Sequence, residues 1–241
     1  MTTPLLHDTD LARIAPLPDD MKRSQLMQMK GGFSPFSYKP VTTCYPDIFN
    51  VQSGMFGASP ATPWKQIQAQ VIRASRLGDE QRNNLQVAKA LYEFASNAGA
   101  IARRHDFFPM HIGVGKKVSF WLPMVLAVDE KPHAIFIDPR RSKGLTELGR
   151  KFVFSMMHER IRAADADFAD IQLGIIRFQD GDDDERSVRF YRDEGIELFS
   201  LDQLETMVAA TYRIWQEVYE ERETDTRRKG TGTGTGTGPL I

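Results

Sequence analysis

The segment with the clearest chemical potential joins an apolar strand to a pair of arginines. Residues 133–138 are expected to form a strand that ends in the carboxylate Asp138, followed by Pro139, Arg140 and Arg141. Sites in α/β proteins commonly form where strands end, so Asp138 and Arg140 are the candidate catalytic residues. A carboxylate beside two guanidinium groups favours an ion pair over bound Mg²⁺, because Mg²⁺ prefers oxygen ligands without a competing cation.

Positive charge is concentrated around the helix expected over residues 145–164. Seven lysines and arginines fall in the span 139–162, against the two acids Glu147 and Glu159, although the whole chain has a net charge of −1. This asymmetry predicts a surface that faces phosphate groups; the alternative is an ordinary amphipathic helix with a charged outer face. The candidate nucleic-acid-binding residues are Arg140, Arg141, Lys143, Arg150 and Lys151, with Lys116 and Lys117 adding to the patch.

Other motifs do not complete a recognised site. The run over 111–117 lacks the first glycine and the Ser/Thr of a phosphate-binding loop, and a strand rather than a helix follows it. His158-Glu159 is followed by Arg162, where a helical zinc site needs a second histidine. The single cysteine, Cys44, excludes a disulfide framework and a cysteine-based zinc site. The sequence therefore predicts no metal site and no cofactor.

Apolar periodicity predicts a body of helices and strands. The expected elements are helices over 64–76 and 80–98, strands over 110–114, 117–128 and 133–138, a helix over 145–164, strands over 169–178 and 187–191, and a last helix. The strand over 169–178 is almost continuously apolar, so we expect it to be central and buried on both faces. Ser200 and Gln203 have the spacing of a capping box at the start of the last helix. This order predicts an α/β (α+β) fold with a mixed central sheet of about five strands flanked by helices.

The layout of residues 80–178 resembles the restriction-endonuclease-like PD-(D/E)xK nuclease superfamily. Asp138-Pro139-Arg140 stands where that family has its acid-x-Lys motif, and Leu122-Pro123-Met124 resembles its Pro-Asp position with the acid missing. In the family, acids on two strands bind Mg²⁺ and position a water for phosphodiester hydrolysis. The resemblance therefore implies a restriction-endonuclease-like fold with a degenerate metal site.

A hairpin geometry limits which acid could complete that site. If residues 117–128 and 132–138 pair, Asp129 lies at the turn, roughly 30 Å from Asp138 at about 3.3 Å per residue, and cannot share a metal with it. An acid from elsewhere would have to migrate into the site. The candidates are Glu93, Asp106 and Asp170.

The first 62 residues are expected to form an irregular arm. Seven prolines interrupt helices and central strands there, yet the segment is too apolar for free disorder. Its large apolar residues are Phe33, Phe36, Tyr38, Tyr45, Ile48, Phe49, Met55 and Phe56. We expect the arm to pack on the body, residues 63–223, or on a second subunit. Residues 224–241 are expected to form a disordered Gly-Thr tail.

Composition excludes several classes of protein. Hydrophobic residues make up 41% and charged residues 26% of the 241 residues, as is usual for a chain that buries a core. The balanced charge excludes a uniform polycation. No apolar run approaches the roughly 18 residues that span a membrane, so no membrane partner is expected, and the scarcity of cysteine favours the cytoplasm.

Three functional hypotheses follow from the sequence. The first is a nucleic-acid-associated protein that holds the DNA or RNA backbone through the basic patch and has a degenerate, inactive metal site. The second is an active Mg²⁺-dependent nuclease with a migrated acid. The third is a non-catalytic structural or interaction subunit, either a homo-oligomer or a protein with a partner at the apolar arm over residues 33–56, because exposed aromatic residues mark interfaces. The first hypothesis is the main prediction.

Overall fold

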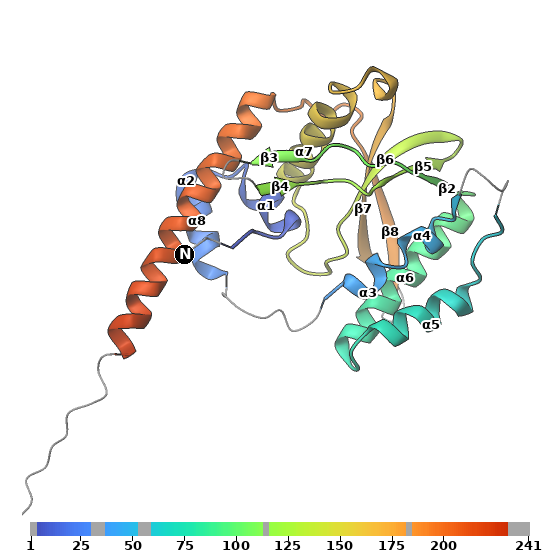
Figure 1. The fold of residues 1–241 in the computed structure, drawn as a ribbon, viewed down its shortest axis with the longest axis horizontal. Coiled ribbons are helices and arrows are strands. Elements are labelled where there is room, and N and C mark those ends of the chain that lie inside the picture. The colour runs from blue at the N-terminus through green and yellow to red at the C-terminus, as the bar shows by residue number, and fades with distance from the viewer. Residues whose placement is uncertain (1–3, 30–36, 53–58, 113–115, 182–184, 231–241) are drawn as a thin grey trace, which may run out of the picture.

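In the computed structural model a mixed β-sheet lies between two layers of helices (Figure 1). The structure describes residues 4–29, 37–52, 59–112, 116–181 and 185–230. Its helices are α1 (Asp8–Ile14), α2 (Asp19–Gln28), α3 (Lys39–Thr42), α4 (Tyr45–Ile48), α5 (Trp64–Ala74), α6 (Asp79–Asn97), α7 (Glu147–Met157) and α8 (Leu201–Gly230). Its strands are β1 (Val51–Gln52), β2 (Ile101–Arg104), β3 (Met110–Ile112), β4 (Lys116–Val118), β5 (Met124–Val128), β6 (Lys131–Ile137), β7 (Gln172–Asp180) and β8 (Arg186–Arg192).

The main sheet has six strands within the described residues, in the order β1-β2-β5-β6-β7-β8. β1 pairs with β2 and β6 with β7 in parallel, whereas the other neighbours are antiparallel. α7 connects β6 to β7, so these three elements form a βαβ unit. The predicted mixed sheet flanked by helices is confirmed. The sequence did not predict β1 and β2, and it predicted one strand over 117–128 where the structure has β4, paired with β3 in a separate ribbon, and β5.

The β5–β6 hairpin forms about the predicted turn. Val128 pairs with Lys131, and Asp129 and Glu130 between them have positive φ angles of 50° and 63°. Two residues in this conformation make the tight turn whose twist matches that of the flanking strands. Asp129 therefore lies at the opposite end of β6 from Asp138, as the sequence predicted.

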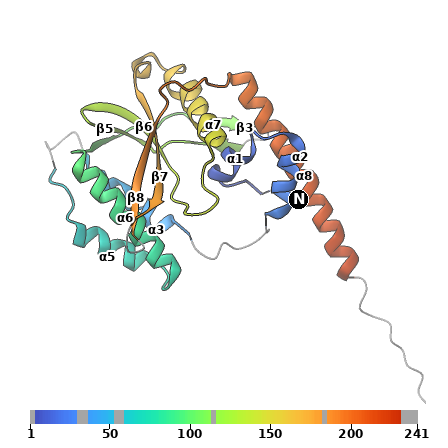
Figure 2. The same ribbon diagram turned by 180° about the vertical axis from the view of Figure 1, so that it is seen from behind.

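Two apolar cores lie on opposite faces of the sheet, because side chains alternate along each strand. In β7, Leu173 and Ile175 belong to the first core, under α1, α2, α7 and α8. Ile176 and Phe178 belong to the second core, under α3 to α6. The two helical layers are seen from both sides in Figure 1 and Figure 2. The prediction that residues 169–178 form a central strand buried on both faces is confirmed.

The later helices lie close to their predicted ranges because their signals are local. α5 and α6 match the helices predicted over 64–76 and 80–98. The capping box at the start of α8 is formed, since the N–H of Ser200 donates to the Gln203 side chain (2.9 Å) and the N–H of Gln203 donates to the Ser200 hydroxyl (3.4 Å). α7 is shorter than predicted and continues as a π-helical turn over His158–Arg162.

α8 continues to Gly230, past residue 224, where the sequence predicted that the tail begins. Residues 231–241, which hold the Gly-Thr repeat after Gly230 and the final Pro239-Leu240-Ile241, lie outside the described residues. None of the helices in the described parts of the chain is both long and apolar enough to cross a membrane.

The described part of residues 1–62 holds four helices and β1, where the sequence predicted an irregular arm. Pro40 and Pro46 fit because they stand in the first turns of α3 and α4, where an intrahelical N–H is not needed. Leu11 and Leu26 are fully buried in the first core, and Phe49 is fully buried in the second. This segment therefore helps to build both cores.

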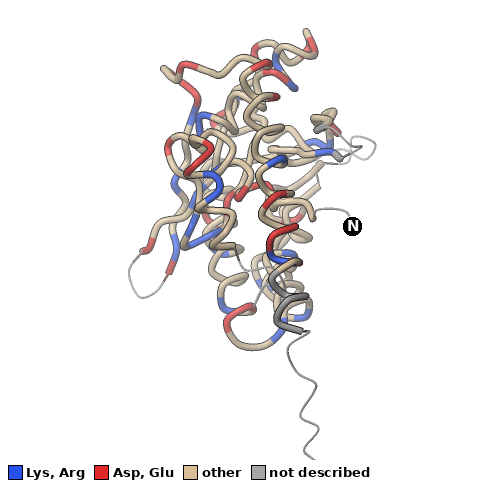
Figure 3. Tube along the Cα trace, turned by 90° about the vertical axis from the view of Figure 1, so that its left-hand side faces the viewer, with Lys and Arg blue, Asp and Glu red and all other residues tan. Residues whose placement is uncertain are grey.

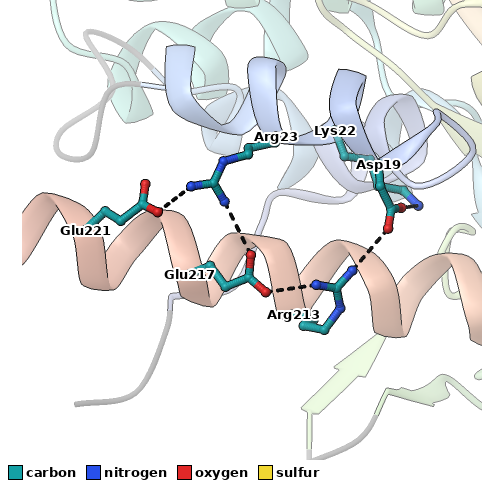
Figure 4. Close-up of polar contacts among 6 residues, drawn as sticks. All are labelled: Asp19, Lys22, Arg23, Arg213, Glu217 and Glu221. Atoms are coloured by element: carbon teal, nitrogen blue, oxygen red, sulfur yellow. Dashed lines mark hydrogen bonds and ion pairs between the residues drawn. The ribbon is translucent and has the colours of Figure 1, made fainter.

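A ladder of ion pairs links α2 to α8 (Figure 4). The ladder contains Asp19, Lys22 and Arg23 on α2 and Arg213, Glu217 and Glu221 on α8. Arg213 joins Asp19 (3.0 Å) to Glu217 (2.8 Å), and Arg23 contacts both glutamates. Apart from that of Lys22, these side chains are exposed or half-buried, so each pair contributes only about 0–1 kcal/mol. Leu26 of α2 is fully buried in the first core and carries more of the packing.

Glu80, in the first turn of α6, ties three parts of the chain together. Its carboxylate accepts hydrogen bonds from the backbone N–H groups of Arg76 (2.9 Å) and Ser37 (3.0 Å) and from the Arg76 guanidinium (2.7 Å). The Arg76 guanidinium, with these backbone donors, lowers the pKa of Glu80 to about 2.

We expect Glu80→Gln to remove part of the acid sensitivity of the fold. A carboxyl group whose pKa is lowered by folding stabilises the protein above its ordinary pKa of 4.5, and that contribution is lost as the pH falls toward about 2. Urea unfolding should therefore show Glu80→Gln to be less stable than the wild type at neutral pH, with the difference shrinking as the pH approaches about 2. Glu205→Gln, at an exposed position of α8, is the matched control. A difference that stays constant with pH would contradict the role given to Glu80.

Candidate functional site

Asp138 lies directly after β6, where the backbone leaves the sheet, and it is fully buried. Its Oδ2 accepts a hydrogen bond from the backbone N–H of Leu145 (2.7 Å) and lies 3.5 Å from Arg177 Nε. Its Oδ1 accepts a weaker bond from the backbone N–H of Arg140 (3.3 Å). Burial raises the pKa of Asp138, although these donors oppose the shift. The carboxylate thus holds the loop over residues 139–145 against the end of the sheet.

Gly144 allows this loop to approach the Asp138–Arg177 pair closely. A Cβ atom at position 144 would lie 2.5 Å from Arg177 Nη2 and 2.8 Å from Asp138 Oδ2, so any side chain there would displace the ion pair. The loop is therefore shaped around a carboxylate that is already paired with a cation. Such a carboxylate is a poor ligand for Mg²⁺.

Arg140 pairs with an acid that lies far away in the sequence. Its Nη1 and Nη2 donate to Oδ1 and Oδ2 of Asp10 in α1, at 2.6 and 2.9 Å. Burial acts to raise the pKa of Asp10, but the hydrogen bonds and charge of Arg140, with the charges of His7 and Arg13, lower it overall. A two-pronged pair of this kind is among the stronger contacts available to arginine. Arg140 therefore joins α1 to the loop after β6.

A cavity of about 960 Å³ opens beside this pair. Its walls come from α1, the end of α2, the region of α3 and the residues that follow β6. Arg140, Arg141 and Lys143 line it, as do Asp8 and Asp10. Burial raises the pKa of Asp8. The cavity therefore carries charges of both signs, unlike a surface built only to face phosphate.

The structure separates the predicted basic patch. Arg150 and Lys151 stand outside the cavity and stack on aromatic rings. The guanidinium carbon of Arg150 lies 4.3 Å from the centre of the Tyr191 ring, and Lys151 Nζ lies 4.3 Å from that of Phe199. Cation–π contacts of this kind explain their position without a bound anion.

The remaining predicted basic residues are divided between two places. Arg141 pairs with Asp180 at the end of β7 (2.8 Å), and Lys143 is exposed in the loop after β6. Lys116 and Lys117 belong to β4, in the separate two-stranded ribbon. The seven candidates are therefore spread over the loop after β6, α7 and β4.

The structure does not bring any of the three acids that could have completed the metal site close to Asp138. Glu93 is exposed on α6 beside Lys89 (3.8 Å), and Asp106 is exposed after β2. Asp170 precedes β7, which runs parallel to β6, so it lies at the opposite end of these strands, roughly 20 Å from Asp138 at about 3.3 Å per residue. Within the described residues, no three His, Cys, Asp or Glu side chains are grouped so that they could hold a metal ion.

Sequence reasoning missed the two partners that define this site, Asp10 and Arg177. Asp10 is 130 residues away from Arg140, and no local pattern connects them. Arg177 did carry a signal, because it is the single charge in the apolar run over residues 171–178 and so needed a buried partner.

Comparison with known proteins identifies the family. A family model described as "Sliding clamp-binding bacterial toxin SocB" matches residues 9–225. The chain belongs to the SocB family. A curated member, "DNA replication inhibitor toxin SocB" of Caulobacter vibrioides (strain NA1000 / CB15N), is 34% identical over 223 residues, which cover 92% of this chain and 93% of that protein. No solved structure matches the chain.

Membership of the SocB family corrects two predictions from the sequence. The main hypothesis, a nucleic-acid-associated protein with a degenerate nuclease site, is wrong, because the family is described as toxins that bind a sliding clamp. The DNA or RNA backbone is likewise the wrong partner, since the family description names a protein. The density of positive charge along the sequence wrongly indicated a nucleic-acid-binding surface, because the arginines pair with distant acids or stack on aromatic rings. The third hypothesis, a non-catalytic interaction protein, agrees with the family.

Proposed function

We propose that this chain binds a bacterial DNA sliding clamp and thereby inhibits DNA replication in the cytoplasm. The observation that carries the proposal is the match of the sliding clamp-binding toxin family to residues 9–225, which is most of the chain. The curated relative, named a DNA replication inhibitor toxin, supports the second half of the proposal. Buried Asp138 and partly buried Arg140, each held in an ion pair, then stabilise the fold and need no catalytic role. The restriction-endonuclease-like layout stays a prediction and implies no nuclease activity.

The sequence also predicted a protein partner at the arm over residues 33–56, and this supplies variants for a test. Several apolar residues of the arm, such as Tyr45 and Phe49, are buried in the second core and are unsuitable for substitution. Four others lie outside the described residues: Phe33, Phe36, Met55 and Phe56. Replacing these residues in pairs with serine asks whether either segment contributes to clamp binding.

The test measures binding of the full chain to the purified sliding clamp of its own bacterium by isothermal titration calorimetry. We expect saturable binding, and inhibition of primer extension by a clamp-dependent polymerase that excess clamp relieves. A contributing pair, Phe33→Ser with Phe36→Ser or Met55→Ser with Phe56→Ser, should weaken binding at least about tenfold, which is about 1.4 kcal/mol. Phe108→Ser with Leu77→Ser is the control, because both side chains are highly exposed elsewhere. Absence of binding by the folded wild-type chain would refute the proposal.

A further inference from the structure

β8 forms one edge of the main sheet, and arginines border that edge. Within the described residues β8 pairs with β7 alone, so its other side is a free strand edge. Figure 3 shows basic positions in blue along the two strands that lead away from the red ends of the β7–β8 turn. Such an edge offers backbone N–H and C=O groups to another extended chain.

The arginines beside this edge are placed close to one another. Arg177 of β7 stands directly opposite Arg189 of β8, so their side chains share one face of the sheet. The guanidinium carbons of Arg150 and Arg189 lie 4.3 and 5.0 Å from the centre of the same Tyr191 ring. Like charges opposite each other destabilise a strand pair, so this arrangement carries a cost in the isolated chain.

The acids that the structure describes do not fully neutralise the positive charge of Arg150, Arg177 and Arg189. Among the acids that the structure describes, Arg177 pairs with Asp138 alone, at 3.5 Å. Among the described residues, neither Arg150 nor exposed Arg189 forms an ion pair, even though Glu147 is only three residues before Arg150 on α7. Guanidinium groups match the geometry of carboxylates, so an acidic ligand would relieve the repulsion.

We propose that the outer edge of β8 docks an extended acidic segment of a protein partner. The segment would add as a strand beside β8, with its backbone paired to the free edge. Because side chains alternate along a strand, acids at every second position would face Arg189 and Arg150. A nucleic acid could meet the arginines but could not pair with the strand edge, so the two features together favour a peptide. This contact is separate from the clamp proposal and does not depend on it.

The test uses the folded full-length chain and fluorescent peptides of about eight residues, close to the length of β8. One peptide alternates Thr and Glu, a second has the same composition with its glutamates in one block, and a third alternates Thr and Lys. A single-stranded oligothymidylate is the fourth probe. Anisotropy gives the affinities, and hydrogen exchange reports protection of the β8 amides.

We expect the alternating Thr-Glu peptide to bind more tightly than the other three probes and to protect the β8 amides. Arg150→Gln with Arg189→Gln should weaken this binding at least about tenfold. Arg73→Gln with Arg103→Gln, which removes two exposed arginines elsewhere, should leave it unchanged. Thermal melting confirms that both double variants fold.

Four outcomes would overturn the proposal. The first is the absence of binding, and the second is equal loss in the control variant. The third is equal binding of the blocked peptide without β8 protection, which would mean a charged surface alone. The fourth is tighter binding of oligothymidylate that depends on the same two arginines, which would mean a nucleic-acid surface.

Discussion

Deleting residues 1–50 is expected to leave the rest of the chain without a cooperative fold. The sequence predicted an irregular arm over the first 62 residues and a separate body over residues 63–223. In the structure, however, Leu11 and Leu26 are fully buried in the first core, and Val41 and Phe49 are fully buried in the second. Removing one large buried side chain typically costs about 2–5 kcal/mol. The loss of four such side chains would cost more free energy than most domains have, since their stability is roughly 5–15 kcal/mol.

The measurement is urea unfolding of the truncated chain, followed by circular dichroism and tryptophan fluorescence. We expect no sigmoidal transition in the truncated chain. Deletion of residues 231–241 is the control for chain shortening, because the Gly-Thr repeat buries no apolar area according to the sequence prediction. Leu11→Ala gives a graded version and should cost about 2–4 kcal/mol. A truncated chain that unfolds with the wild-type midpoint would show that the two cores do not need this segment.

The elements that could be predicted from the sequence carry their own local signals. α6 has an apolar stripe with helical spacing, and β7 is an apolar run, interrupted by Arg177, between polar ends. The capping box of Ser200 and Gln203 marks the start of α8 within four residues. Patterns of this length are fixed by the chemistry of neighbouring residues and need no knowledge of the rest of the fold.

The first 62 residues and the site were harder to predict because their contacts are long-range. Pro40 and Pro46 indicated breaks in secondary structure, yet they stand in the first turns of the helices α3 and α4, where proline is tolerated. The partner of Arg140 is Asp10, which no spacing rule could supply. A list of basic residues therefore indicated a nucleic-acid surface, whereas the fold pairs or stacks most of them inside the protein's own structure.

The second large effect is expected at Asp138, where a single carboxylate joins β6, β7 and the start of α7. Asp138→Ala would leave the backbone N–H of Leu145 without its acceptor and the Arg177 guanidinium without its acid. Removing one member of a buried, hydrogen-bonded ion pair typically costs about 3–5 kcal/mol. Because Arg177 is partly exposed and water can solvate it, we expect the lower end, about 3 kcal/mol, in urea unfolding at neutral pH.

Asp138→Asn keeps the shape of the side chain but removes its negative charge, so it separates the contributions of the two to stability. The amide oxygen can still accept from Leu145, but the amide nitrogen cannot accept from a second donor, so we expect a smaller loss of about 1–2 kcal/mol. The pH dependence gives an independent check, with a sign opposite to that of Glu80. Burial raises the pKa of Asp138, so its contribution is fully present below the ordinary pKa and declines as the pH rises through the raised value. Asp138→Asn should lack that decline.

These two variants also test whether the site is structural. If Asp138 acts only through the fold, Asp138→Asn should bind the sliding clamp as the wild type does at temperatures where both are folded. Asp180→Asn, which removes the exposed pair with Arg141, is the matched control and should change neither stability nor binding appreciably. A stable Asp138→Asn protein that loses clamp binding would instead place this carboxylate in the interaction itself, since loss of folding could not explain the result.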